Sequence, residues 1–201
     1  MLAAMSARPD LPAVVGRAFA VSLRAGSVSF CRNETGRLLA TLAATRVGTM
    51  AEFGTGCGVG TAWLRSGVRG SQTRILTAER DPELARAAAE TFADDDQVEV
   101  VAADWSTLRD RGPYSLLFLD ADPGEPGEPG SADHVDVDAV ADLVEAGGIV
   151  VLDDFTPCEQ WPPLVRGRVD TLRERWLTDD RFTTVEVMVS SDASTLIATR
   201  R

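Results

Sequence analysis

The stretch EFGTGCGVGTAWL, residues 52–64, is the most informative part of the sequence. Its glycines stand at positions 54, 56, 58 and 60, between an apolar run typical of a buried strand and a segment with helical spacing. Glycine lets a backbone approach a ligand closely, and a helix N-terminus offers unpaired N–H groups to a carboxylate or phosphate. The stretch predicts a ligand-binding strand–loop–helix unit; a tight strand–helix turn without a ligand is the simpler alternative.

The spacing of these glycines differs from the dinucleotide-binding fingerprint G-x-G-x-x-G/A. Whether the fingerprint begins at residue 54, 56 or 58, its last position holds valine, threonine or tryptophan. Because the third glycine or alanine allows close helix–strand packing in that motif, its absence in every frame disfavours a nicotinamide dinucleotide as the ligand.

Polar residues stand at the ends of the next two strand-like runs. Glu79 ends RILTAE (74–79), where a ribose hydroxyl pair would need a carboxylate. Ala103, Asp104 and Trp105 end the following run and can offer hydrogen bonds and an aromatic wall to an adenine. A solvated Glu79 and a helix-capping Asp104 are the simpler alternatives. Together with the glycine loop, these residues predict a nucleoside-type cofactor.

Strand-like and helix-like runs alternate along most of the chain. Five apolar runs, at 49–53, 74–79, 98–103, 115–120 and 149–154, call for a parallel sheet covered on both faces. Residues 183–189 and 194–200 carry a hairpin signal. We therefore predict an α/β, doubly wound (Rossmann-like) fold: a seven-stranded, mostly parallel sheet with helices on both faces and a C-terminal antiparallel hairpin.

The helices and the domain organisation follow from the same pattern. Residues 11–23 and 35–47 have helical spacing, and residues 137–148 are predicted as a helix with Gly147 just past its end. We expect a single domain over residues 1–201, with a helical N-terminal region (1–48) and a core (49–201). FTPCEQWPPLVRG (155–167) is expected to be a loop.

Composition limits the class of protein. The net charge of −11 argues against binding to nucleic acid, and the arginines at 166, 168, 173 and 175 are interpreted as the solvated face of a helix. No apolar run is long enough to cross a membrane, and the first residues do not resemble a signal peptide, so a cytoplasmic location is expected. Three cysteines and one histidine indicate neither a disulfide framework nor a multi-histidine metal site. All 20 basic residues are arginine.

The glycine loop and its partners resemble a known family. Glu52-x-Gly54-x-Gly56-x-Gly58, followed by Glu79, is similar to motif I and its acidic partner in class I S-adenosylmethionine-dependent methyltransferases. Within that class, three further motifs resemble the catechol and caffeoyl-CoA O-methyltransferase group. They are Thr35-Gly36-Arg37-Leu38-Leu39, Leu119-Asp120, and Gly147-Gly148 followed by Asp153-Asp154.

The resemblance implies roles for individual residues. Glu79 would bind the ribose hydroxyls of S-adenosylmethionine, Gly54 and Gly58 would approach its methionine part, and Asp104 and Trp105 would lie beside its adenine. Asp120 would lie near the sulfonium and the acceptor. The full predicted cofactor set is Glu52, Gly54, Thr55, Gly56, Gly58, Thr61, Glu79, Arg80, Ala103, Asp104, Trp105 and Asp120.

Aspartates at two neighbouring strand ends predict a metal site. Asp120 follows the fourth strand and Asp153-Asp154 end the fifth, so their carboxylates should converge at one edge and suit Mg²⁺ or another divalent cation. The simpler alternative is that Asp153 and Asp154 cap the following segment. In the resembling group a lysine commonly stands three residues after the first aspartate as the base, but here that position is Pro123 and the chain has no lysine.

The candidate catalytic residues are therefore Asp120, Asp122 and His134. Two other possibilities are a metal-bound hydroxide as the base, and a transfer that needs little help from a base because donor and acceptor are well aligned. We expect O-methyl transfer to a small-molecule acceptor, without nucleic-acid or membrane partners; a homodimer is suggested by the resemblance alone. Two alternatives stay open: a cofactor-binding protein without turnover, and a nicotinamide-dependent oxidoreductase.

Overall fold

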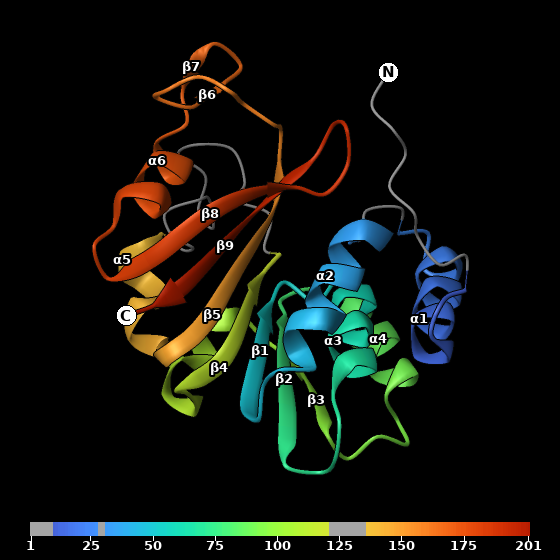
Figure 1. Cartoon of the computed structure of the whole chain (residues 1–201). Helices are drawn as coiled ribbons and strands as arrows, with labels where there is room; N and C mark the ends of the chain where they lie inside the picture. The colour runs from blue at the N-terminus through green and yellow to red at the C-terminus, as the bar shows by residue number, and fades with distance from the viewer. Residues whose placement is uncertain (1–9, 28–30, 121–135) are drawn as a thin grey trace.

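A seven-stranded sheet forms the centre of the structure, a computed structural model that describes residues 10–27, 31–120 and 136–201 (Figure 1). The strand order is β3-β2-β1-β4-β5-β9-β8. Neighbours from β3 to β5 are parallel, and β9 runs antiparallel to both β5 and β8. The predicted fold and its C-terminal hairpin are therefore confirmed. The strands are β1 (Gly48–Phe53), β2 (Thr73–Glu79), β3 (Val98–Ala102), β4 (Tyr114–Leu119), β5 (Val144–Phe155), β8 (Phe182–Met188) and β9 (Ser194–Arg200).

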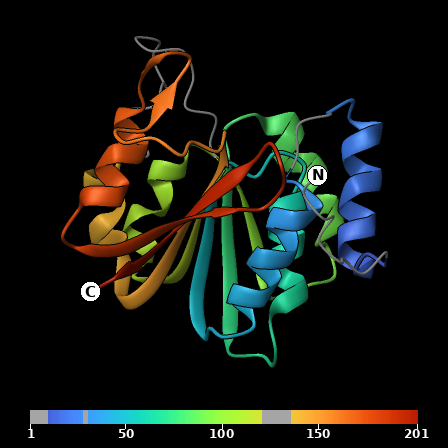
Figure 2. The same ribbon diagram turned by 45° about the horizontal axis from the view of Figure 1, so that its top comes forward.

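Helices cover both faces of this sheet (Figures 1 and 2). One face carries α2 and α3, with α1 packed on α3 and α4; the other carries η1, α5, η3 and α6. The bounds are α1 (Ala13–Arg24), α2 (Asn33–Ala43), α3 (Val59–Gly67), α4 (Pro82–Thr91), η1 (Trp105–Arg111), α5 (Val137–Val140), η3 (Ala141–Leu143) and α6 (Thr171–Thr178). No helix among the described residues is long and apolar enough to span a lipid bilayer.

Strand β4 shows why the sheet needs a cover on each side. All six of its residues are buried. Leu116 and Phe118 join the hydrophobic cluster that includes α2 and α3, whereas Leu117 and Leu119 join the cluster that includes α5 and α6. Successive side chains of a strand point to opposite faces, so an unbroken apolar run must be covered on both.

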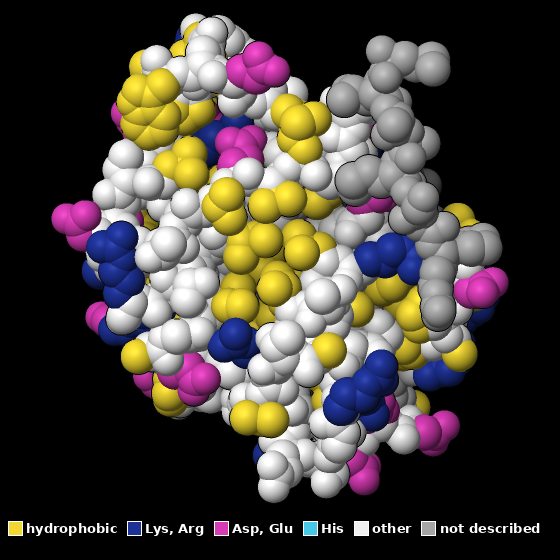
Figure 3. All heavy atoms as spheres, in the orientation of Figure 1, with side chains coloured by type: hydrophobic (Ala, Val, Ile, Leu, Met, Phe, Trp, Pro, Cys, Tyr) yellow, Lys and Arg dark blue, Asp and Glu magenta, His cyan; other side chains and the backbone are white. Residues whose placement is uncertain are grey.

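The part of the sheet formed by β8 and β9 is less covered. Apolar side chains gather over these strands at the centre of the face in Figure 3. Val185 and Met188 of β8 are 53% and 51% exposed. None of the described helices lies over this part of the face (Figure 1).

The predicted helix over residues 137–148 is wrong in its second half. Helix α5 ends at Val140, η3 follows, and β5 already begins at Val144. Val144 is fully buried and pairs with Tyr114 of β4. The register then shifts before the next pair, and Gly147 has a φ of 77°. Sheet pairing therefore overrides the local helical pattern, and the irregularity accommodates the two glycines.

The segment expected to be a loop at 155–167 contains the first strand of a second, two-stranded sheet. Its strands are β6 (Leu164–Val165) and β7 (Arg168–Val169). The arginines in and after it are not one solvated helix face, because Arg173 of α6 is only 1% exposed. Arg166 and Arg168 lie before α6 begins at Thr171, so only Arg175 of the four is an exposed helix residue, and the interpretation of these arginines as one solvated helix face is wrong.

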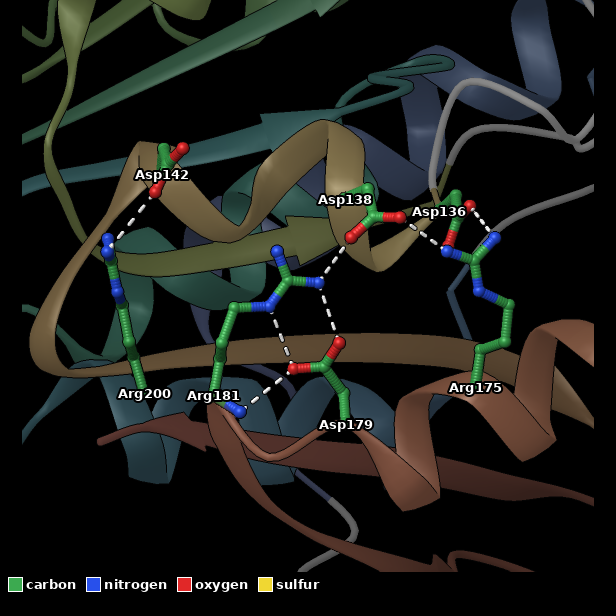
Figure 4. Close-up of polar contacts among 7 residues, drawn as sticks. All are labelled: Asp136, Asp138, Asp142, Arg175, Asp179, Arg181 and Arg200. Atoms are coloured by element: carbon green, nitrogen blue, oxygen red, sulfur yellow. Dashed lines mark hydrogen bonds and ion pairs between the residues drawn. The ribbon is translucent and has the colours of Figure 1, made fainter.

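An ion-pair network joins α5 to α6 and to the start of β8 (Figure 4). Arg175 pairs with Asp136 and Asp138 on either side of the first residue of α5. Arg181 pairs with Asp138 and also with Asp179, 2.6 Å away. Hydrogen bonds from Arg181 and Arg175 hold the pKa of Asp138 below its usual range. The short helix α5 is thus attached to the C-terminal part of the fold.

Candidate active site

The glycine loop leaves β1 at Gly54 and enters α3 at Val59. Gly56 and Gly58 have φ values of 51° and 86°, a region that side chains with a Cβ rarely adopt. The N–H groups of Gly54 and Thr55 donate to the carbonyl of Ala78 at 3.1 and 3.2 Å. These two bonds fasten the loop to the end of β2.

Glu79 lies at the edge of this loop. Its Oε2 accepts the N–H of Gly56 at 2.8 Å, and its Oε1 accepts the N–H of Asp81 at 2.9 Å. An ionised carboxylate has about four lone-pair sites, so these two bonds leave it able to accept further hydrogen bonds. In the part of the chain that the structure describes, a Cβ placed on Gly56 would meet no heavy atom within 4 Å, so the loop is open there with respect to those residues. The structure thus places an oriented carboxylate beside an accessible backbone.

A buried polar network supports the loop from below. Oε2 of Glu52 accepts hydrogen bonds from the hydroxyls of Thr61 and of Thr77, the latter at 3.0 Å. The hydroxyls of Thr77 and Thr55 are 2.5 Å apart. Glu52, Thr61 and Thr77 are fully buried. Glu52 and Thr61, both predicted as cofactor contacts, therefore occupy positions that hold the loop in place.

The environment of Glu52 is unusual for a carboxyl group. Burial raises its pKa to about 8, and its Oε1 has no hydrogen-bond partner among the described residues. A Cβ at position 60 would lie 2.0 Å from this oxygen, which explains the glycine there. Thr77 was not predicted as part of the site, although a threonine inside the apolar run RILTAE was a visible signal.

The residues predicted to lie beside an adenine make several contacts within the protein itself. Trp105 is 9% exposed and stacks on Phe53, with 4.7 Å between the ring centroids. The guanidinium of Arg109 lies over the Trp105 ring at 5.3 Å. Asp104 caps η1 by accepting the N–H of Ser106 at 2.9 Å. Trp105 thus packs largely in the core, and its expected place beside an adenine stays a prediction. Ala103 is half-buried and Arg80 is exposed.

The three predicted aspartates do meet at one edge of the sheet. Leu119, the last residue of β4, pairs with Leu152 of β5, so the residues after them, Asp120 and Asp153, lie at the same level of two neighbouring parallel strands. Burial, followed by repulsion from Glu52, Asp154 and Asp153, raises the pKa of Asp120 well above its usual range. The pKa of Asp154, which adopts a positive φ of 67°, is also raised, mainly by partial burial.

The arrangement of this edge does not favour a metal ion. Oδ1 of Asp153 already accepts hydrogen bonds from Thr35 and Thr195. Among residues 10–27, 31–120 and 136–201, no three His, Cys, Asp or Glu side chains come together in a way that could hold a metal. The prediction of a divalent cation at Asp120, Asp153 and Asp154 is therefore not supported. Asp122 and His134 lie outside the described residues.

Cys31 belongs to this edge but was not predicted to do so. The thiol is 4% exposed. Its pKa is raised by burial first and then by the negative charges of Asp120 and Asp153. Cys31, two residues before α2, therefore lies near the aspartates, and Thr35 within α2 donates a hydrogen bond to Asp153. Nothing in the sequence pattern places residue 31 beside strands that come so much later in the chain.

Comparison with known proteins agrees with this geometry. A family model described as a methyltransferase domain matches residues 51–155. A comparison with curated proteins finds no match. Many solved structures share the fold.

Three of these structures illustrate the likeness. The O-methyltransferase from Bacillus cereus, solved in complex with SAH, has a TM-score of 0.73 and 18% identity over 96% of this chain and 93% of that chain. The O-methyltransferase TomG from Streptomyces achromogenes, solved with SAM, has a TM-score of 0.73 and 18% identity over 96% of this chain and 92% of that chain. The SAH-bound methyltransferase PaMTH1 from Podospora anserina has a TM-score of 0.73 and 18% identity over 95% of this chain and 89% of that chain. At this identity the likeness establishes a shared fold.

Proposed function

Because the chain belongs to the methyltransferase domain family, we propose that it is an S-adenosylmethionine-dependent methyltransferase that methylates an oxygen atom of a small molecule. The observation that carries the cofactor assignment is the pair formed by Glu79 and Gly56. The carboxylate is held by two backbone N–H groups next to an open stretch of backbone. A carboxylate so placed suits the two hydroxyls of a ribose, and the open backbone suits close approach of the rest of the cofactor.

The other predicted contacts extend this assignment. Gly54 and Gly58 lie at the two ends of the loop and would border the methionine part of the cofactor. Asp104 follows the end of β3 and would border the adenine. Ala103 and Arg80 come directly after Ala102 and Glu79, which pair across β3 and β2, and would lie at the same edge of the sheet. Glu52, Thr55 and Thr61 would act indirectly, by holding the loop in shape.

S-adenosylmethionine supplies a methyl group on a positively charged sulfur, which leaves as a neutral thioether after in-line attack by the acceptor. The acidic edge formed by Asp120, Asp153 and Asp154 is electrostatically suited to a cationic group. Asp120 would border both the sulfur and the acceptor. Alignment of donor and acceptor can supply a large part of the acceleration of such a transfer.

The acceptor's proton must also be removed. With no lysine in the chain, the lysine base of the resembling group is excluded. Burial, followed by repulsion from neighbouring carboxyls, raises the pKa of Asp120 well above its usual range, so its ionised form accepts a proton more readily than an exposed aspartate does, and Asp120 stays a candidate base. Asp122 and His134 stay predictions. The absence of a lysine also keeps open the alternative of a protein that binds the cofactor without turnover.

Titration calorimetry with S-adenosylmethionine, S-adenosylhomocysteine and NAD⁺ tests the cofactor assignment. We expect heats from the first two and none from NAD⁺. Failure of both sulfur compounds to bind would contradict the proposal, and binding of NAD⁺ alone would favour the oxidoreductase alternative.

Methyl transfer to a panel of phenols and other hydroxyl compounds, followed by mass spectrometry, then separates an enzyme from a binding protein. Products that carry one added methyl group on oxygen would support the proposed reaction. Cofactor binding without any product over a broad panel would favour the binding protein. The single domain, the cytoplasmic location, the homodimer and the lack of nucleic-acid partners stay predictions.

A further inference from the structure

Asp153, near the end of β5, connects two elements that are far apart in the sequence. Its Oδ1 accepts a hydrogen bond from the hydroxyl of Thr35 in α2 at 3.0 Å and another from Thr195 in β9 at 2.6 Å. Both threonines are fully buried. A buried hydroxyl that loses its partner is destabilising, so this shared oxygen matters to both elements.

A second contact joins the same two parts of the fold at the surface. Arg32, the residue before α2, contacts both carboxylate oxygens of Asp192 in the turn between β8 and β9, at 3.2 and 3.3 Å. Figures 1 and 2 show this turn next to the start of α2. An exposed ion pair contributes little stability, but like the buried contact it joins the start of α2 to the C-terminal part of the sheet.

Helix α2 has little freedom on its other side. A Cβ on Gly36 would lie 2.2 Å from Nε1 of Trp63 in α3. A Cβ on Gly67, at the end of α3, would lie 2.0 Å from the carbonyl oxygen of Ala40. Helix α2 is therefore held between α3 and the β8–β9 hairpin, and Asp153 is its buried connection to the sheet.

The same contacts bear on metal binding. An acceptor oxygen has two lone-pair sites, and the two threonine hydroxyls use both of those on Oδ1 of Asp153. A cation at this oxygen would have to displace buried hydrogen bonds. Oδ2 keeps its lone pairs, but the described residues bring no group of three His, Cys, Asp or Glu side chains together to hold a cation there, so Asp153 fits a structural role better than a role as a metal ligand.

We propose that Asp153 is a positioning residue that fastens α2 to β9, keeps Cys31 and the start of α2 in place as a wall of the site beside Asp120, and binds no divalent cation. The claim about the wall rests on the proposed function. The claims about α2 and about cations do not, since they can be measured without cofactor.

Amide hydrogen exchange in α2 tests the fastening. We compare the wild type with Asp153→Asn, whose amide oxygen can still accept both hydroxyls, with Asp153→Ala, and with the double variant Thr35→Val/Thr195→Val. Exchange in α2 should be about 10–100-fold faster in the alanine and valine variants, and within a few-fold of wild type in Asp153→Asn. If Asp153→Asn accelerates exchange as much as Asp153→Ala, the shared oxygen is not the fastener and the proposal fails.

Titration of Mn²⁺ into the same proteins, after treatment with EDTA and with and without S-adenosylhomocysteine, tests the claim about cations. We expect no Mn²⁺ binding that depends on Asp153, and equal behaviour of wild type and Asp153→Asn. Mn²⁺ binding by the wild type that disappears in Asp153→Asn would overturn the proposal. If Asp153→Ala does not fold, Asp153→Asn and the valine variant still decide both claims.

Binding of S-adenosylhomocysteine by the same variants tests the claim about the wall. Asp153→Ala should weaken this binding about 10-fold, because α2 no longer holds Cys31 in place, and Asp153→Asn should restore it. If the variants with faster exchange in α2 bind S-adenosylhomocysteine as tightly as the wild type, the claim about the wall is refuted and the claim about the fastening of α2 is not. Absence of cofactor binding by the wild type would instead contradict the proposed function and leave the exchange and Mn²⁺ results standing.

Discussion

Glu79 and Gly56 are joined by a hydrogen bond of 2.8 Å that connects the end of β2 to the glycine loop. The same carboxylate accepts the N–H of Asp81 at 2.9 Å. One side chain therefore fixes the shape of the loop and presents a charge at its edge.

This relationship makes Glu79 the most informative position for cofactor binding. We expect Glu79→Ala to weaken binding of S-adenosylhomocysteine about 10–100-fold, because it removes hydrogen bonds to a charged group. Glu79→Gln should have a smaller effect, since its amide oxygen can still accept the N–H of Gly56. Titration calorimetry measures both, with Glu83→Ala, whose side chain is 80% exposed on α4, as the control. Unchanged affinity in Glu79→Ala would refute the role of Glu79.

Glu52 should make stability depend on pH. Its pKa in the folded protein is about 8, whereas an exposed glutamate has a pKa of about 4.3. The folded state therefore holds this proton more tightly than the unfolded state. The resulting stabilisation is complete below about pH 4 and is lost as the pH rises to about 8, by roughly 1.4 kcal/mol per pH unit.

The variant Glu52→Gln, which cannot ionise, isolates this effect. Relative to the variant, the free energy of unfolding of the wild type should decrease steadily between about pH 5 and about pH 8. Urea denaturation at several pH values in this range gives the difference. Parallel profiles for the two proteins would mean that Glu52 titrates normally.

Gly67 and Gly16 should respond in opposite ways to alanine. At Gly67 the new Cβ would lie 2.0 Å from the backbone carbonyl of Ala40, so α2 and α3 must separate, and we expect a loss of about 1–3 kcal/mol. At Gly16, in α1, the Cβ would meet no heavy atom of residues 10–27, 31–120 or 136–201 within 4 Å. There alanine should stabilise the protein by about 0.5–1 kcal/mol because of its higher helix propensity. Thermal unfolding of both variants shows whether Gly67→Ala is less stable, and Gly16→Ala more stable, than the wild type. An unchanged stability of Gly67→Ala would contradict the close approach of the helices.

Arg173 and Arg175 are close in sequence but should differ strongly in their contribution to stability. Arg173 is 1% exposed and pairs with Asp170 at 3.1 Å and Glu186 at 3.3 Å. Arg173→Met leaves these carboxylates without a cation and should cost about 3–5 kcal/mol. Arg175, at 48% exposure, belongs to the network in Figure 4, and Arg175→Ala should cost less than about 1 kcal/mol. Denaturant unfolding of the two variants checks the contrast, and equal losses would refute it.

The sequence predicted those parts of the fold that depend on local pattern. The strands that lead to Glu79 and Asp120 are unbroken apolar runs, and the glycine loop is marked by its composition. Val144 shows the limit, because its neighbours favour a helix and only its pairing with Tyr114 makes it part of a strand. Trp105 and Arg173 show a second limit, since an aromatic residue expected beside a ligand and an arginine expected on a solvated face are both buried.

The candidate site was harder to predict where it depends on distant parts of the chain. The position of Asp120 beside Asp153 follows from strand order alone. The bond from Thr35 to Asp153 does not, because no periodicity connects a helix near the start of the chain with a strand beyond residue 150. The location of Cys31 next to these aspartates depends on the same packing of α2.

The place of β9 in the sheet also affects how a newly made chain can assemble. This strand lies between β5 and β8, although both precede it in the sequence. Until residues 194–200 have been synthesised, β5 and β8 each lack a neighbour, and Val150 and Leu152 belong to an open edge. Unpaired edges invite association with other chains, and pairing over long sequence separations is slow. A ribosome stalled before Ser194 should therefore release a product that aggregates, and folding should be completed only after translation has passed this strand.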